Sequence, residues 1–244
     1  MTDSTQANHP AESTKSAREL NDEIRYLMYA VFRVRTDVPG LAGRERAAAV
    51  AEAEQLFEAM AGKDVYTRGS YSLSGYRADA DLLMWWTCPD PDLLQETYRR
   101  FRQTRLGYVL EPVWSVVGLH RPAEFNRGHI PAFVRREQPR RYLCVYPFVR
   151  SLEWYLLEPD ERRSMLAEHG QMARDYPDVR SNTVACFGLN DYEWLLGFEA
   201  DELHRIVDLM RHLRGAAARR HTREELPFYT GVAKPIAEIV ADLP

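Results

Sequence analysis

The chain has 244 residues, a length that suits either one large domain or two repeated halves. Its formal net charge is −4 and 28% of its residues are charged, which indicates a soluble globular protein and argues against a nucleic-acid partner. No run of about 18 apolar residues is present, so the sequence predicts no membrane span.

Two further features indicate the cellular compartment. Residues 1–24 are polar and lack the apolar run of a secretory signal, so we expect them to form a disordered tail. The three cysteines (Cys88, Cys144 and Cys186) are scattered and have no C-x-x-C spacing. This pattern predicts reduced thiols in a cytoplasmic protein and argues against a zinc site.

Residues 25–120 predict six elements in the order β-α-β-β-α-β. Apolar alternation, helical periodicity and turn residues place them at Tyr26–Arg35, Gly43–Met60, Val65–Leu73, Ala80–Thr87, Asp90–Arg105 and Pro112–His120. The second of the two central strands is expected to return along the first as a β-hairpin.

Residues 142–244 predict the same order again. The corresponding elements are Tyr142–Phe148, Asp160–Tyr176, Thr183–Leu189, Tyr192–Glu199, Asp201–Ala218 and Pro227–Ala233. This repetition predicts an α+β fold of two tandem ferredoxin-like repeats. Pressing their open sheet faces together would give a dimeric α+β barrel within one chain. Residues 121–141 would form the linker between the halves, which at that length is expected to be functional or disordered.

The strand that opens the second half contains an unusual group of residues. Pro147 cannot donate a ladder hydrogen bond, yet it interrupts an apolar run. Tyr146 precedes it and Arg150 follows, and arginine is almost never fully buried unless it is paired. Residues i and i+4 of a strand share a face, so the phenol and the guanidinium are expected to lie on one side.

His169 lies on the apolar stripe of the predicted helix 160–176, together with Met165, Met172 and Tyr176. It is therefore expected to point into the protein. A core histidine hydrogen-bonded to a neighbour is the ordinary interpretation. The alternative is an axial ligand of haem iron, for which Gly170 would let a flat macrocycle approach the helix.

The linker contains two further candidates. His129 is flanked by apolar residues, which favours a docked loop in which the imidazole could act as an acid or base; a loop histidine is otherwise simply exposed. The run RREQPRR places Arg135, Arg136, Arg140 and Arg141 close together. Such a run is usually a solvated charge cluster, but it could also receive a ligand with several carboxylates.

Four short motifs together resemble the chlorite dismutase-like superfamily. They are YPFVR at Tyr146–Arg150, WYLL at Trp154–Leu157, EHG at Glu168–Gly170 and GLNDYEW at Gly188–Trp194. Within that superfamily the chain resembles the coproheme decarboxylases of Gram-positive bacteria, and in particular the actinobacterial branch. The resemblance covers nearly everything after residue 24.

The resemblance implies a cytoplasmic enzyme that uses hydrogen peroxide to decarboxylate Fe-coproporphyrin III (coproheme), which is both substrate and redox centre, to haem b via harderoheme. This is the last step of coproporphyrin-dependent haem biosynthesis. His169 would be the proximal iron ligand, Tyr146 the redox tyrosine, His129 the distal base and Arg150 a propionate-binding residue. Pro147, Phe148, Val149 and Trp154 would complete the porphyrin site, and Trp194 also matches the family pattern. The resemblance further implies a homopentamer.

Two other functions stay open from the sequence. Chlorite dismutation on the same fold requires a distal arginine after the proximal helix, and Arg180 is the one arginine in VRSNTVACFGL. A non-enzymatic haem-binding protein would need no Tyr146. Arg150 is itself a departure, since the Firmicute branch of the family has lysine at the matching position.

Overall fold

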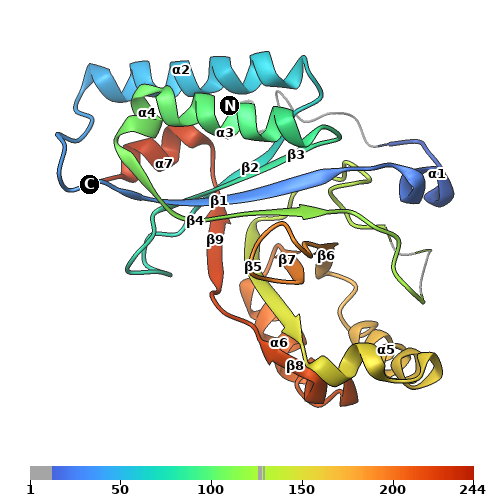
Figure 1. Ribbon diagram of the computed structural model, residues 1–244. Helices are drawn as coiled ribbons and strands as arrows, with labels where there is room; N and C mark the ends of the chain where they lie inside the picture. Colours follow the sequence, from blue (N-terminus) through green and yellow to red (C-terminus); the bar gives the residue numbers. More distant parts are fainter. Residues whose placement is uncertain (1–12, 126–127, 129) are drawn as a thin grey trace.

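The structure is a computed structural model that describes residues 13–125, 128 and 130–244, and it has the predicted mixed α+β composition (Figure 1). The N-terminal elements are α1 (Ala17–Asp22), β1 (Tyr26–Val34), α2 (Arg44–Ala61), β2 (Tyr66–Ser72), β3 (Leu82–Cys88), α3 (Pro91–Gln103), α4 (Arg105–Tyr108) and β4 (Leu110–Leu119). The C-terminal elements are β5 (Tyr142–Arg150), η2 (Leu152–Leu156), α5 (Pro159–Ala173), β6 (Arg180–Ala185), β7 (Trp194–Ala200), α6 (Leu203–Leu213), η3 (Ala217–His221), β8 (Thr222–Glu224), β9 (Tyr229–Ala233) and α7 (Ile236–Asp242).

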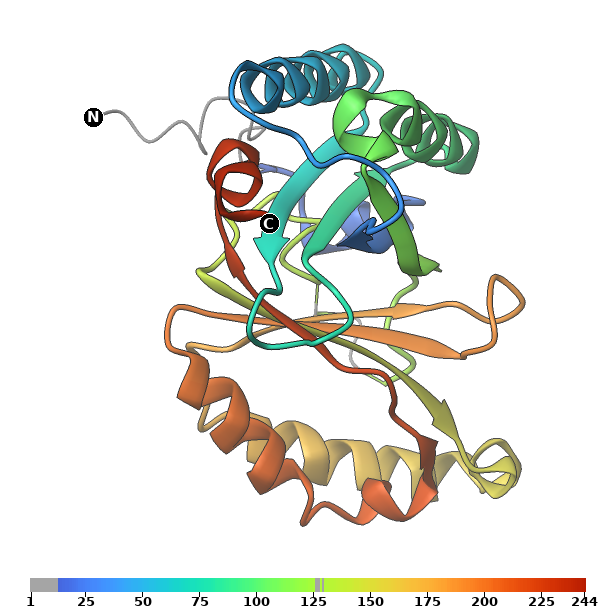
Figure 2. The same cartoon turned by 90° about the vertical axis from the view of Figure 1, so that its left-hand side faces the viewer.

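The strands lie between two layers of helices. Helices α2, α3, α4 and α7 cover β1–β4 on one side, and α5 and α6 cover the strands of the second half on the other (Figures 1 and 2). The antiparallel ladders follow the order β7-β6-β4-β1-β3-β2-β9-β5-β8, and β5 also pairs with β7. Only short ladders join the halves: Leu119 pairs with Ala185, and Tyr71 and Ser72 pair with β9.

Strand alternation divides the buried side chains among three clusters. Along β1, Met28 and Phe32 face the core beneath α2, α3 and α7, whereas Leu27, Tyr29 and Val31 face the core between the two halves. The same rule applies to β5. Leu143 and Val145 enter the central core, while Cys144 and Tyr146 point toward the layer that contains α6. Tyr146 is therefore directed away from the centre of the molecule.

Arg68 and Glu199 join the halves through a fully buried ion pair. The guanidinium of Arg68 on β2 donates two hydrogen bonds, of 2.8 and 2.7 Å, to the carboxylate of Glu199 on β7. A third bond goes to the backbone oxygen of Glu137 at 2.8 Å, and the guanidinium lies 4.9 Å from the ring centre of Trp85. The charge is thus fully matched inside an otherwise apolar core.

A close backbone approach also connects the halves. The hydroxyl of Tyr29 on β1 lies where a Cβ atom at Gly197 on β7 would stand, since the two positions are only 2.4 Å apart. A side chain at position 197 would displace the ring of Tyr29, and glycine leaves room for it.

The structure corrects several sequence predictions. Residues 13–24 are not a disordered tail, because Ser16 and Glu19 form a capping box that starts helix α1. The helix predicted for 201–218 ends at Leu213, and the strand predicted for 183–189 ends at Ala185. The linker packs against the core through buried residues such as Phe133.

In the described ranges, no helix has the length and apolar character needed to cross a bilayer.

We expect Glu199→Gln to lower the free energy of unfolding by about 3–5 kcal/mol, because Arg68 would stay charged and buried without an anionic partner. Urea denaturation measures this change. Glu111→Gln is the matched control, since Glu111 forms an exposed cross-strand ion pair with Arg33 and should have little effect. Arg68→Met combined with Glu199→Leu should recover much of the loss. A single-variant cost no larger than that of the control would contradict this account.

Candidate functional site

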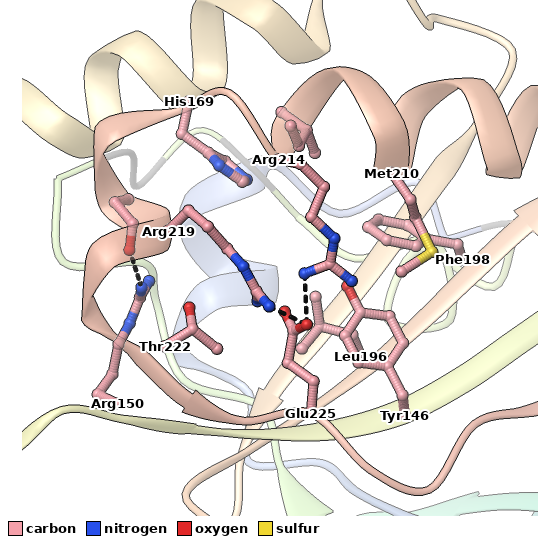
Figure 3. A pocket seen from close by; sticks show the side chains of 12 residues that line it. Tyr146, Arg150, His169, Leu196, Phe198, Met210, Arg214, Arg219, Thr222 and Glu225 are labelled. Atoms are coloured by element: carbon pink, nitrogen blue, oxygen red, sulfur yellow. Dashed lines mark hydrogen bonds and ion pairs between the residues drawn. The ribbon is translucent and has the colours of Figure 1, made fainter.

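A pocket opens between the sheet of the second half and its helices (Figure 3). Its volume is about 500 Å³, counting the space at its open mouth. Strands β5 and β7, helices α5 and α6, and the chain that follows α6 supply its lining, which consists of Tyr146, Arg150, His169, Leu196, Phe198, Met210, Leu213, Arg214, Ala218, Arg219, Thr222 and Glu225. An apolar floor with a few convergent polar groups is typical of a small-molecule site.

Tyr146 provides a buried phenol. Its ring packs 4.7 Å from that of Phe228 and 6.0 Å from that of Phe198, measured between ring centres. Burial raises the pKa of Tyr146 well above its usual value, because the charged phenolate would lose its hydration. The side chain is therefore a neutral phenol at physiological pH.

Arg150 lies on the same face of β5, as predicted, and both residues line the pocket. The guanidinium is stacked between aromatic rings, 4.2 Å from the ring centre of Trp154 and 4.8 Å from that of Phe148. One nitrogen donates a 3.3 Å hydrogen bond to the backbone oxygen of Ala218. Burial lowers the pKa of Arg150, but a guanidinium stays protonated at neutral pH. The site thus holds a permanent positive charge.

Pro147 occupies the gap between two ladders. On one edge of β5, pairing with β9 ends at Val145 and pairing with β8 begins at Val149. On the other edge Pro147 lies opposite Leu195 of β7. The missing N–H group is tolerated because this part of the strand has no partner on the β8–β9 side.

Phe148, Val149 and Trp154, which were also predicted to form the porphyrin site, are not among the residues that line the pocket. Trp154 is buried under Arg150, and Val149 is buried beside it in sequence. Phe148 stacks on Trp194, with ring centres 6.1 Å apart. Phe148 and Trp154 both contact the guanidinium of Arg150 and so help to hold it in place.

His169 points into the pocket from α5 (Figure 3). Burial lowers the pKa of His169 below its ordinary value of 6.5, and the charge of Arg150 lowers it further, while Glu168 opposes the change. The imidazole is therefore neutral at physiological pH, which is the form that binds metals.

Helix α5 is less buried than the sequence predicts. None of its residues is fully buried, and Met165, His169 and Met172 are each only partly exposed. The helix covers a pocket instead of a packed core. Gly170 is exposed, and a Cβ atom there would meet nothing within 4 Å, so packing within the chain does not require glycine at this position.

His129 lies outside the described residues. The arginine-rich run of the linker does not reach the pocket: Arg136 pairs with Asp64 and Arg140 with Asp201. Arg180 likewise does not line the pocket, since it pairs with Glu137 at 3.0 Å.

Three charged residues of the pocket were not predicted from the sequence. Arg214 directly follows α6, Arg219 belongs to η3, and Glu225 directly follows β8. Both arginines form ion pairs with the carboxylate of Glu225. Residues 214–225 (RGAAARRHTREE) contain charges of both signs, which could have indicated a polar site. The alanines in this run instead favoured a longer helix.

No group of three or more His, Cys, Asp or Glu side chains that could hold a metal ion occurs among the described residues. His169 could supply one axial nitrogen to the iron of a macrocycle.

Comparisons with known proteins identify the family of the chain. The family model described as chlorite dismutase matches residues 46–234. The chain is 56% identical to a coproheme decarboxylase of Mycolicibacterium smegmatis over 226 residues, which cover 92% of this chain and 96% of that protein.

Solved structures have the same fold. The chlorite dismutase of Candidatus Nitrospira defluvii in complex with imidazole superposes with a TM-score of 0.79 at 27% identity, covering 92% of this chain and 97% of that one. A second structure, assigned to chlorite dismutase, has a TM-score of 0.80 at 22% identity, covers 91% of this chain and 100% of its own, and bears on the fold alone. The chain belongs to the chlorite dismutase family.

Proposed function

We propose that this chain is a coproheme decarboxylase that uses hydrogen peroxide to convert Fe-coproporphyrin III, through harderoheme, to haem b. One observation supports this most strongly: Tyr146, His169 and three arginines surround a single pocket with an apolar floor. The relative that is 56% identical over nearly the whole chain carries the name coproheme decarboxylase.

The pocket residues fit an iron porphyrin that carries four propionates. Leu196, Phe198 and Met210 offer an apolar surface to a flat macrocycle, and His169 offers a neutral imidazole nitrogen to the iron. The guanidinium groups of Arg150, Arg214 and Arg219 match carboxylates in charge and geometry. When bound, the iron porphyrin would supply the redox chemistry by which each of two propionates loses CO₂, one proton and two electrons to become a vinyl group, while one hydrogen peroxide per propionate takes up the electrons and is reduced to water.

The residues of the chain would position the propionate and supply the hydrogen acceptor. Arg150 holds the propionate carboxylate, and its stacking on Trp154 fixes the guanidinium in place. Tyr146 accepts a hydrogen atom from that propionate after its own has been removed. Its burial keeps the phenol protonated until then. His129 remains the proposed distal base, because the family resemblance assigns it that role.

The proposal extends to the finer architecture. The repeated order of elements and the β5–β7 ladder support two tandem ferredoxin-like repeats, 25–120 and 142–244, joined by residues 121–141 into a dimeric α+β barrel. By family resemblance the protein would act as a homopentamer in the cytoplasm, with coproheme and hydrogen peroxide as its substrates.

Chlorite dismutation and non-enzymatic haem binding are the alternatives. The pairing of Arg180 with Glu137, away from the pocket, does not favour chlorite dismutation. The burial of Tyr146 beside charged pocket residues is a feature that a simple carrier does not need.

Mass spectrometry of the porphyrin tests the reaction directly. We expect peroxide added to the protein loaded with ferric coproheme to remove two carboxyl groups in succession. Tyr146→Phe should abolish both losses, because phenylalanine cannot donate or accept the hydrogen atom. Porphyrin that stays intact or only bleaches in the unaltered protein would favour the haem carrier or the chlorite dismutase instead.

Replacement of His169 tests the iron ligand. We expect His169→Ala to weaken coproheme binding and to shift the Soret band of the ferric complex, because the imidazole nitrogen would be lost. Addition of free imidazole should restore part of the spectrum. An unaltered spectrum would exclude His169 as the ligand and return it to the role of an ordinary pocket-lining side chain.

The pKa of His169 should respond to Arg150. In the metal-free protein, an NMR titration of the His169 ring should give a pKa below 6.5, and Arg150→Met should raise it toward that value. Arg163→Met is the matched control, because Arg163 is an exposed arginine of the same helix. The unfolded chain binds this proton more readily than the folded chain, so His169 lowers stability as the pH falls below 6.5. Equal effects of the two variants would contradict this assignment.

A further inference from the structure

Glu225 is the only acidic side chain among the described residues that line the pocket. Its carboxylate forms ion pairs with both Arg214 and Arg219, and Figure 3 shows it between the two guanidinium groups. The side chain of Glu225 is only 16% exposed. Two arginines from different elements therefore converge on one largely buried carboxylate, inside the space that we assign to the porphyrin.

The charges of Glu225, Arg214 and Arg219 act on the proposed redox tyrosine, Tyr146. Figure 3 shows the ring of Tyr146 beside the side chain of Arg214. Burial is the main cause of the raised pKa of Tyr146; the charge of Glu225 also raises it, and the two arginines oppose the rise. Glu225 and its partners thus lie next to the phenol, where one of the two reacting propionates would be held while Arg150 holds the other.

The two guanidinium groups can serve only a limited number of carboxylates. Glu225 pairs with both arginines through one carboxylate oxygen, at the Nη1 nitrogen of each, and the arginine side chains are 42% and 38% exposed. A propionate that takes these two nitrogens must replace Glu225. Substrate and product differ at this point, because the substrate carries a carboxylate where the product carries an apolar vinyl group.

We propose that Glu225 is an internal counter-ion that competes with a substrate carboxylate for Arg214 and Arg219. This inference rests on the proposed function. Glu225 yields the two arginines when the tetracarboxylate binds and pairs with them again once that carboxylate has left as CO₂. The exchange removes the contacts that held the substrate and so favours release of the product.

Metal-free porphyrins test this exchange apart from iron ligation and from peroxide chemistry. Coproporphyrin III represents the substrate with four carboxylates, and protoporphyrin IX represents the product with two. Quenching of tryptophan fluorescence on titration gives a dissociation constant for each. We expect Glu225→Gln to tighten coproporphyrin III binding by about tenfold, since the charge-assisted contacts of Glu225 with both arginines no longer have to be broken on binding. Protoporphyrin IX binding should stay unchanged or weaken.

Glu224→Gln is the matched control. Glu224 is exposed and adjacent in sequence, so the variant removes the same charge at nearly the same place, and it should leave both dissociation constants unchanged. Equal tightening of both porphyrins by Glu225→Gln would contradict the exchange, because it would indicate a general charge effect. Unchanged or weaker coproporphyrin III binding would contradict it as well.

If a thermal melt shows that Glu225→Gln is poorly folded, a variant of one of its arginine partners tests the proposal instead. Arg214→Gln leaves Glu225 paired with Arg219 and should weaken coproporphyrin III binding while sparing protoporphyrin IX. A loss shared equally by both porphyrins, or no loss, would overturn the proposal. Neither result bears on whether the protein decarboxylates coproheme, which the mass measurement decides separately.

Discussion

The site depends on one constraint, which is that β5 is covered on both of its faces. Alternate residues of a strand point to opposite sides, so Leu143 and Val145 fill the core between the halves while Tyr146 and Arg150 face the outer pocket. A shift of one residue in the pairing of β5 with β7 would bury Arg150 in the central core and remove Tyr146 from the pocket. The strand pairing that fills the central core therefore also places Tyr146 and Arg150 in the pocket.

Buried arginines have two different roles in this structure. Arg68 has its donors matched by Glu199 and by the backbone of Glu137, so it closes the central core and leaves no charge for a ligand. Arg150, in contrast, has aromatic rings and one backbone oxygen as its partners. A guanidinium that is held by stacking is still able to form an ion pair with an incoming carboxylate. Arginine therefore stabilises the central core at position 68 and is available to bind a ligand at position 150.

The sequence predicts the strands and long helices because their apolar periodicity is local. Tyr146 and Arg150 could be paired for the same reason, since their separation along one strand fixes their relative direction. His169 could be placed on the apolar stripe of its helix, but its exposure could not be foreseen, because that depends on what the helix covers.

Arg214, Arg219 and Glu225 could not be assigned to the pocket from the sequence. The helix was expected to continue to Ala218, because alanine favours helix, but the chain leaves the helix after Leu213 and turns at Gly215. Only this turn brings Arg219 and Glu225 back toward β5. Contacts of this kind depend on the exact end of an element, which local propensity defines least well.

The pocket has to distinguish two ligands that share one macrocycle. Contacts made by Leu196, Phe198 or His169 would be nearly the same for a tetracarboxylate and for the dicarboxylate derived from it. Interactions common to both cannot separate them, because selectivity is a difference between two affinities. The difference must therefore arise where a carboxylate is replaced by an apolar group, and in this pocket the arginines supply that contact. A protein carboxylate beside those arginines lowers the affinity for the substrate, but it also gives both guanidinium groups an anionic partner when the product forms.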